Sequence, residues 1–312
     1  MTLTLSRYGQ MDKLGEMHVP RVGSSPVDIL LSAYTLLKQV IPPYTAPGLN
    51  YLEAVRLLAP HRISLESVTQ GTFDIFSSKL ASAQESEYLR EMGVFISAAF
   101  NLSGLAKLVD TGHEGIGYRL AEGKQLIVNN KNRLVFVGEE AAGDIALLGD
   151  AVMFADGSRS GFQVSWGDTS GFANLSTGGI KINCNNSTAF GIRAKGCFLV
   201  SYSPVGSFGS LTEEVVLLNY DAARFFGYDT KQVFKFDEGH VSFHPDSSLI
   251  ANYFWKLQKD REIRKLLEGV RTLKAVAGMR DRPAKALAMV NAYDWKGLEV
   301  RLRATMNGDG RG

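Results

Sequence analysis

Residues 179–200 read GIKINCNNSTAFGIRAKGCFLV, and this stretch decides the fold. It begins with an apolar-x-apolar unit, Ile180-Lys-Ile182, and the same kind of unit returns eighteen residues later as Phe198-Leu-Val200. A second apolar position lies between the two units at Phe190 and is followed by Gly191. A fixed period near twenty residues with short β-like runs predicts a solenoid, in which each coil stacks on the previous one.

The same period extends outward in both directions. Apolar-x-apolar units begin at Leu134, Val152, Ile180, Phe198, Val216 and Phe234, and each interval is eighteen residues except one of twenty-eight after Val152. A shortened extra unit, Phe162-Gln-Val164, fits into that interval. We therefore expect about seven coils in a rod on the order of 34 Å long, with an irregularity at residues 162–178.

Alternation along a strand assigns the two faces of each unit. Its first and third positions are apolar in every coil, so we expect Ile180 and Ile182 to face the interior and Lys181 to face outward. The fourth position is small and polar in later coils, as at Asn183, which favours a turn. Glycines such as Gly191 indicate a positive φ or a tight corner.

The flanks have a different period. We predict an N-terminal arm and α-helical domain over 1–113, a parallel β-solenoid over 114–245, and a C-terminal α-helical region with a short disordered tail over 246–312. The fold class is therefore α+β and multidomain. Open strand edges at the two ends of a solenoid invite pairing with other chains, and the helical flanks are placed to cap them.

Ile180, Ile182, Gly191 and Gly196 carry a family resemblance. The surrounding run resembles the GXGXG-type β-helix repeat, which is found in the C-terminal domain of the glutamate synthase large subunit and in formylmethanofuran dehydrogenase. The resemblance covers residues ~116–244 only. It implies a right-handed parallel β-helix with an architectural role and no catalytic residues of its own.

Composition limits the class of protein. The formal net charge is +2 and charged residues make up 21%, so nothing global demands an anionic partner. The two cysteines, Cys184 and Cys197, occupy different positions in their coils, so we expect no disulfide and a reducing, cytoplasmic environment. We expect no membrane span, because the apolar runs are too short, and no cofactor.

Histidines are the first candidates for chemistry. His240 and His244 lie in an acidic turn after the last coil, where a metal site competes with a simple capping turn. Residues four apart on a strand are about 13 Å from each other, so the capping turn is the better interpretation. His113 could act as a general base beside Glu114, but a structural hydrogen bond at the helix–solenoid junction is favoured.

Cys184 and its neighbours form a second group. Cys184 has no basic residue near it in the sequence, which favours a packed thiol over a nucleophile. Trp166, Tyr202 and Tyr220 hold the same position in their coils. They could form an aromatic ladder that binds a sugar or a partner, although stacking between coils is the commoner outcome.

The C-terminal segment is basic. Thirteen Lys and Arg stand against six Asp and Glu between Lys256 and Arg303. A possible interaction surface recurs at helical spacing, formed by Arg261, Arg264, Lys265, Arg271 and Lys274. Nucleic acid could bind such a stripe. The alternative, an amphipathic helix whose apolar face docks on the solenoid, is favoured.

These observations lead to one main functional prediction. Because no acid/base pair, nucleophile or metal cluster stands out, we expect a non-catalytic scaffold that presents its solenoid surface for self-association or binding of a partner protein. Two alternatives remain: an enzyme with a site at the helix–solenoid junction, and nucleic-acid binding through the basic C-terminal helices.

Overall fold

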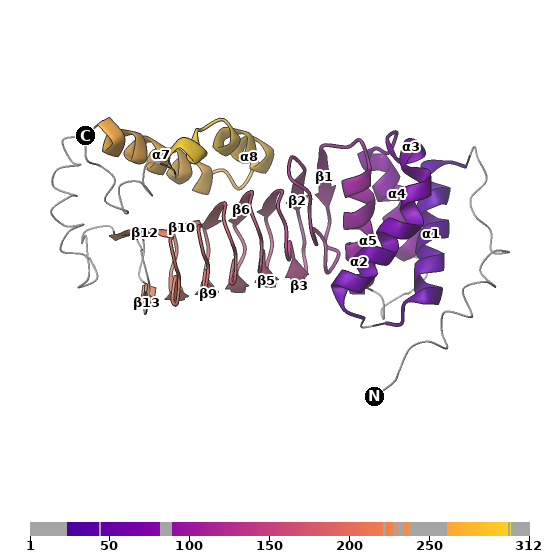
Figure 1. The fold of residues 1–312 in the computed structure, drawn as a ribbon, viewed down its shortest axis with the longest axis horizontal. Helices are drawn as coiled ribbons and strands as arrows, with labels where there is room; N and C mark the ends of the chain where they lie inside the picture. The colour runs from indigo at the N-terminus through magenta and orange to yellow at the C-terminus, as the bar shows by residue number, and fades with distance from the viewer. Residues whose placement is uncertain are drawn as a thin grey trace.

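The structure is a computed structural model, which describes residues 24–43, 45–81, 89–220, 223–227, 229, 234–237, 261–298 and 300. Figure 1 shows an elongated molecule with a helical bundle at one end, a stack of strands in the middle and two helices along one side of the stack. The predicted α+β fold with a central parallel solenoid between helical regions is confirmed.

The helical bundle forms around aromatic side chains. Its helices are α1 (Pro26–Val40), α2 (Pro47–Leu58), α3 (Arg62–Leu65), α4 (Gln70–Ala81) and α5 (Leu89–Leu102). The Ser25 side chain caps α1 by accepting a hydrogen bond from the Asp28 amide at 3.3 Å. Tyr34, Phe76 and Phe95 meet in the core, with ring centroids 5.2–5.9 Å apart. No described helix is long and apolar enough to cross a membrane.

The solenoid consists of two parallel sheets. Sheet A has eight strands in the order β1 (Lys107–Asp110), β2 (Gln125–Val128), β4 (Asp144–Leu147), β6 (Phe162–Ser165), β8 (Ile180–Asn183), β10 (Phe198–Ser201), β12 (Val216–Asn219) and β14 (Phe234–Asp237). Sheet B has six, in the order β13 (Ala223–Phe226), β11 (Val205–Phe208), β9 (Ser187–Phe190), β7 (Thr169–Phe172), β5 (Ala151–Phe154) and β3 (Leu134–Val137). From β2 onward successive strands alternate between the two sheets, so each coil adds one strand to each sheet.

The eighteen-residue register is confirmed in the later coils, but the predicted irregularity is wrong. The first coils depart from the period instead: Leu134 pairs with Ala151, 17 residues away, and Gln125 with Asp144, 19 residues away. Ile180, Phe198 and Val216 lie opposite one another in sheet A, and Phe162 pairs with Ile180 as a regular member of the same column. Val152 belongs to sheet B. The interval of twenty-eight residues therefore runs from a strand of sheet B, at Val152, to a strand of sheet A, at Ile180. Residues 162–178 contain no inserted unit. Both sheets carry apolar-x-apolar units, so spacing alone did not distinguish them.

The predicted orientation of sheet A is also wrong. Ile180 and Ile182 belong to an apolar cluster that sheet A shares with the C-terminal helices, so they face outward. Leu199 and Leu217, from the intervening positions, pack in the interior core with the phenylalanines of sheet B. Lys181 shares their face of the sheet and is fully buried. Because both faces of sheet A are covered, polarity could not reveal which one is inside.

A phenylalanine ladder fills the interior on the side of sheet B. Phe154, Phe172, Phe190 and Phe208 stack with centroids 4.7–4.9 Å apart, which matches the spacing of the coils. The residue after each ring has a positive φ, +67° at Gly191 and +54° at Ala173. A Cβ at Gly191 would lie 2.3 Å from Leu199 Cδ1. Gly191 therefore has both predicted features, a positive φ and a corner too tight for a Cβ atom.

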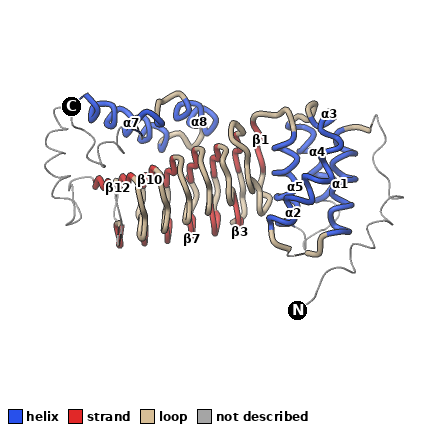
Figure 2. The backbone as a smooth tube through the Cα atoms, in the orientation of Figure 1, coloured by secondary structure: helices blue, strands red, loops and turns tan. Residues whose placement is uncertain are grey.

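The C-terminal helices cover sheet A. Figure 2 shows α7 (Arg261–Ala277) and α8 (Pro283–Asn291) running along the stack of strands. The Trp166 indole donates to the Ala277 carbonyl at 2.8 Å, and the Asn291 amide donates to the Asp144 carboxylate at 2.6 Å. The favoured interpretation, in which an amphipathic helix docks on the solenoid, is confirmed. These helices cover the side of the rod, however, and not its end as expected.

The N-terminal bundle does cap the first coil. One face of α5 carries Gly93, Ser97 and Asn101, spaced four residues apart. Gly93 lets the helix approach so closely that an added Cβ would lie 2.0 Å from the Glu114 carbonyl oxygen. Ser97 Oγ accepts from the Gly117 amide at 2.8 Å. Asn101 accepts from the Ala121 amide and donates to the Arg119 carbonyl, both at 2.9 Å.

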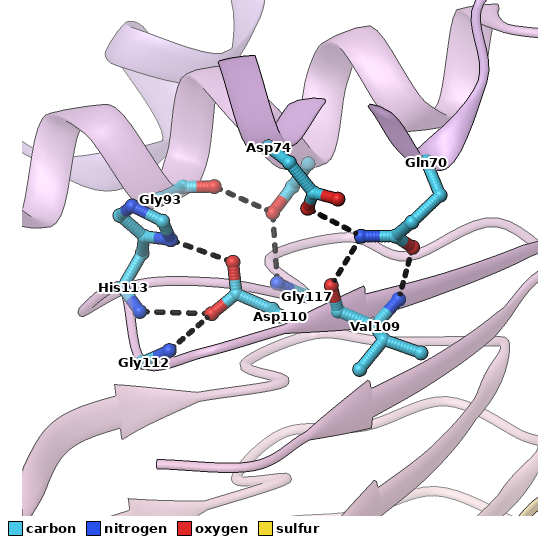
Figure 3. Close-up of polar contacts among 9 residues, drawn as sticks. Gln70, Asp74, Gly93, Val109, Asp110, Gly112, His113 and Gly117 are labelled. Atoms are coloured by element: carbon cyan, nitrogen blue, oxygen red, sulfur yellow. Dashed lines mark hydrogen bonds and ion pairs between the residues drawn. The ribbon is translucent and has the colours of Figure 1, made fainter. Parts of the chain in front are cut away.

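A glutamine side chain satisfies the edge of the first strand. Figure 3 shows Gln70 of α4 beside Val109 of β1. Its Oε1 accepts from the Val109 amide and its Nε2 donates to the Val109 carbonyl, both at 2.8 Å. This carboxamide reproduces the pairing of a further strand and so blocks the edge. Since β1 begins at Lys107, the solenoid starts N-terminal to the boundary predicted at residue 113.

The close contact at Gly93 yields a stability prediction. Gly93→Ala places a methyl group against the Glu114 backbone, so we expect the free energy of unfolding to fall by about 2–3 kcal/mol. Gly71→Ala is the matched control in α4, where an added Cβ meets only Thr69 Oγ1 at 3.7 Å. The control should be neutral or stabilising by less than about 1 kcal/mol. Urea denaturation measures both; equal values would contradict the close packing of cap and coil.

Candidate functional site: a polar groove on the solenoid

A hollow lies along one corner of the solenoid. It is a groove of about 750 Å³ at the turns that lead from sheet A into sheet B. The residue that precedes each sheet B strand forms its polar wall. These residues occupy the same position in successive coils and are all exposed: Arg133, Asp150, Asp168, Asn186 and Pro204.

Small side chains on the outer face of sheet B open this groove. The column that holds Val152 in β5 continues with Ser170, Thr188 and Gly206. Gly206 packs against its neighbour so closely that an added Cβ would lie 2.6 Å from the Thr188 carbonyl oxygen. The small side chains of Ser170, Thr188 and Gly206 leave room beside the corner residues.

Hydrogen bonds hold one end of the groove in place. Asp150 Oδ1 accepts from the Asp168 amide at 2.8 Å, and the Arg133 guanidinium donates to Ser170 Oγ. The side chains of Asp168, Asn186 and Thr188 form no hydrogen bond with another described residue. Their donors and acceptors are therefore directed to solvent or to a ligand.

His113 takes part in a structural turn. Its Nδ1 lies 2.6 Å from Asp110 Oδ2, while Asp110 Oδ1 accepts from the Gly112 and His113 amides at 2.8 and 2.9 Å (Figure 3). The Asp110 carboxylate thereby fastens the loop after β1. No serine or cysteine of the described chain is bonded to the imidazole. This geometry agrees with the structural hydrogen bond, which is favoured over a role for His113 as a general base beside Glu114.

The column of Cys184 lies beneath the C-terminal helices. Tyr202 and Tyr220 stack with ring centroids 4.7 Å apart, and Tyr202 donates to the Val270 carbonyl of α7 at 3.5 Å. Trp166 is buried against the same helix. Burial raises the pKa of the Cys184 thiol, which opposes its ionisation. No disulfide joins the two cysteines. The aromatic ladder therefore binds the chain's own helix.

The remaining sequence candidates are placed only in part. His240 and His244 lie outside the described residues. Arg261, Arg264 and Lys265 fall in the first turns of α7, whose side chains there are likewise outside the description. Arg271 and Lys274 are exposed on the face of α7 opposite the buried Leu273 and Val276. No group of three or more His, Cys, Asp or Glu able to hold a metal occurs in the part of the chain that is described.

A buried lysine is an unexpected feature of the interior. Lys181 Nζ contacts Gln163 Oε1, from the neighbouring coil, and lies 3.3 Å from the Ser160 carbonyl oxygen. Gln163 in turn donates to the Gly143 and Ser160 carbonyls at 2.8 and 2.9 Å. Burial lowers the pKa of Lys181 to about 8. The solenoid thus encloses a lysine amine whose hydrogen bonds go to a backbone carbonyl oxygen and a side-chain amide oxygen.

Asp156 is a second ionisable group within the coils. Its Oδ1 accepts from the Asn174 amide at 3.1 Å, and Asn174 Oδ1 repeats this contact with the Ile192 amide one coil later at 2.9 Å. Burial raises the pKa of Asp156 to about 6, against the effect of these hydrogen bonds. Its role is to bond successive turns of the solenoid.

Comparison with known proteins found no matching family model, no similar curated protein and no similar solved structure. The geometry of the chain itself therefore carries the functional argument.

The groove and the buried lysine were both missed in the sequence. Asp150, Asp168 and Asn186 recur every eighteen residues, but the repeat is defined by its apolar positions, and these polar residues lie outside them. Lys181 is predicted on the outer face because its neighbours Ile180 and Ile182 occupy the positions that are apolar in every coil. A search for polar residues at equal spacing would have found the first, and no signal in the sequence marked the second.

Lys181 predicts how stability depends on pH. Its folded pKa lies below the ~10.4 of an exposed lysine, so between these values the unfolded chain binds more protons. Stability should therefore rise as pH increases from about 8 to about 10, by up to about 3 kcal/mol. Lys181→Met should lack this rise. Denaturant unfolding at several pH values tests it, and parallel curves for the two proteins would contradict a buried, desolvated amine.

Proposed function

We propose that this protein is a non-catalytic scaffold, whose solenoid presents one sheet face for assembly with a second copy of the chain. The observation that supports it most is the difference between the two sheets. Strands β6, β8 and β10 of sheet A are buried on both faces, by the interior and by α7 and α8. No described helix lies over the outer face of sheet B (Figure 1).

The chemistry of that open face supports a protein contact. Its N-terminal half is apolar, with Val135, Val152 and Met153 on β3 and β5, and Met153 is 41% exposed. Its C-terminal half carries small residues such as Thr188 and Ala189. A sheet face that joins an exposed apolar half to a half with small side chains suits a protein interface.

The N-terminal cap limits which surface is available for assembly. The edge strand β1 is paired by Gln70 and covered by α5, so end-to-end addition at that end is blocked. Assembly through the side of the rod then fits better than growth along its axis. The resemblance of residues ~116–244 to architectural GXGXG-type repeats points in the same direction.

The test is the oligomeric state of the purified chain. By light scattering at micromolar concentration we expect the wild type to associate, and Met153→Lys to weaken association about tenfold or more by placing a charge on the interface. Ile63→Lys is the control, because Ile63 is 85% exposed on the helical bundle, away from sheet B. A wild type that is strictly monomeric would contradict self-assembly.

A further inference from the structure

The corner groove has an axial repeat that a ligand would have to match. Asp150, Asp168 and Asn186 occupy one position in three successive coils, and hydrogen-bonded coils lie ~4.8 Å apart. Polar groups therefore recur along the solenoid axis at the spacing of the coils. A molecule that fills the groove must be extended and must carry its own polar groups at a similar interval.

The types of polar group select the chemistry of that ligand. The carboxylates of Asp150 and Asp168 only accept hydrogen bonds, the guanidinium of Arg133 only donates, and Asn186 and Thr188 do both. Hydroxyl groups can satisfy all of them, since each hydroxyl both donates and accepts. Two carboxylates against one guanidinium disfavour a polyanion.

The C-terminal end of the groove adds a small apolar surface. The exposed ring of Pro204 lies one coil beyond Asn186 and offers a contact for the C–H groups of a sugar ring. At the other end, Arg133 reaches across to Ser170, which brings a donor close to the two carboxylates. A chain of sugar units offers hydroxyl groups and an apolar ring face along its length. The donors, the acceptors and the one apolar contact of the groove could therefore bind it.

We propose that the groove binds an extended, uncharged oligosaccharide that runs parallel to the solenoid axis. Asp168 and Asn186 accept hydrogen bonds from ligand hydroxyls, Thr188 and Arg133 donate to them, and Pro204 packs against a ring face. This function goes beyond the assembly proposed above and does not depend on it. Thr188 belongs to both surfaces, but Met153, on which the test of assembly rests, does not line the groove.

Affinity electrophoresis of the full chain tests the proposal. Native gels would contain, separately, a neutral β-glucan, a neutral galactomannan, a neutral xylan or the anionic polygalacturonate. We expect at least one neutral polymer to retard the wild type, and polygalacturonate to have no effect. Asp168→Ala and Asn186→Ala should each weaken binding about tenfold, as expected for the loss of a hydrogen bond to a ligand hydroxyl.

Two controls make the outcome decisive. Glu213→Ala removes an exposed carboxylate outside the groove and should bind as the wild type does. Met153→Lys should keep its retardation, which separates this proposal from that of self-assembly. Absence of retardation by all three neutral polymers would overturn the proposal. So would unchanged binding by Asp168→Ala and Asn186→Ala, provided that thermal unfolding shows both to be folded, or retardation by polygalacturonate alone.

Discussion

The hydrogen-bonded ladder between successive coils is the constraint on which the rest of the structure depends. Each coil pairs in parallel with the one before it, so a residue's neighbours above and below are those eighteen positions away. Such a column favours side chains that stack on their own kind or that hydrogen-bond along the axis. The phenylalanine ladder from Phe154 to Phe208 is the first solution, and the repeated contact of Asp156 and Asn174 is the second.

A ladder of this kind leaves an open strand edge and an apolar sheet face, and the flanking helices cover both. Its first edge is closed by Gln70 and by the face of α5 that carries Ser97 and Asn101. Its apolar sheet A is covered by α7 and α8, which also hold the tyrosine column. The outer face of sheet B and the corner beside it stay open among the described residues. For this reason we place both proposed binding functions there.

The sequence predicted the repeat well and its geometry less well. The eighteen-residue period, the positive φ at Gly191 and the docking of an amphipathic C-terminal helix all follow from local pattern. Which face of sheet A points inward does not follow from local pattern. Ile180 is buried under the C-terminal helices and Leu199 is buried in the interior of the solenoid, so both positions are apolar. The groove depends on which exposed residues of separate coils come together. To predict the groove, the coils must be aligned correctly. The unit Val152-Met-Phe154 hides this alignment, because it lies in sheet B but has the apolar-x-apolar pattern of a sheet A strand.

Cross-linking of engineered cysteines tests the register most directly. In a background of Cys184→Ser and Cys197→Ser, Ser170→Cys with Thr188→Cys places two thiols on adjacent coils, and Val152→Cys with Thr188→Cys places them two coils apart. The first pair should form a disulfide under mild oxidation, because neighbouring Cα atoms ~4.8 Å apart are within bonding range, whereas two coils exceed it. Mass spectrometry of the oxidised, unreduced protein gives the answer. Equal cross-linking of both pairs, or of the second alone, would contradict the in-register solenoid.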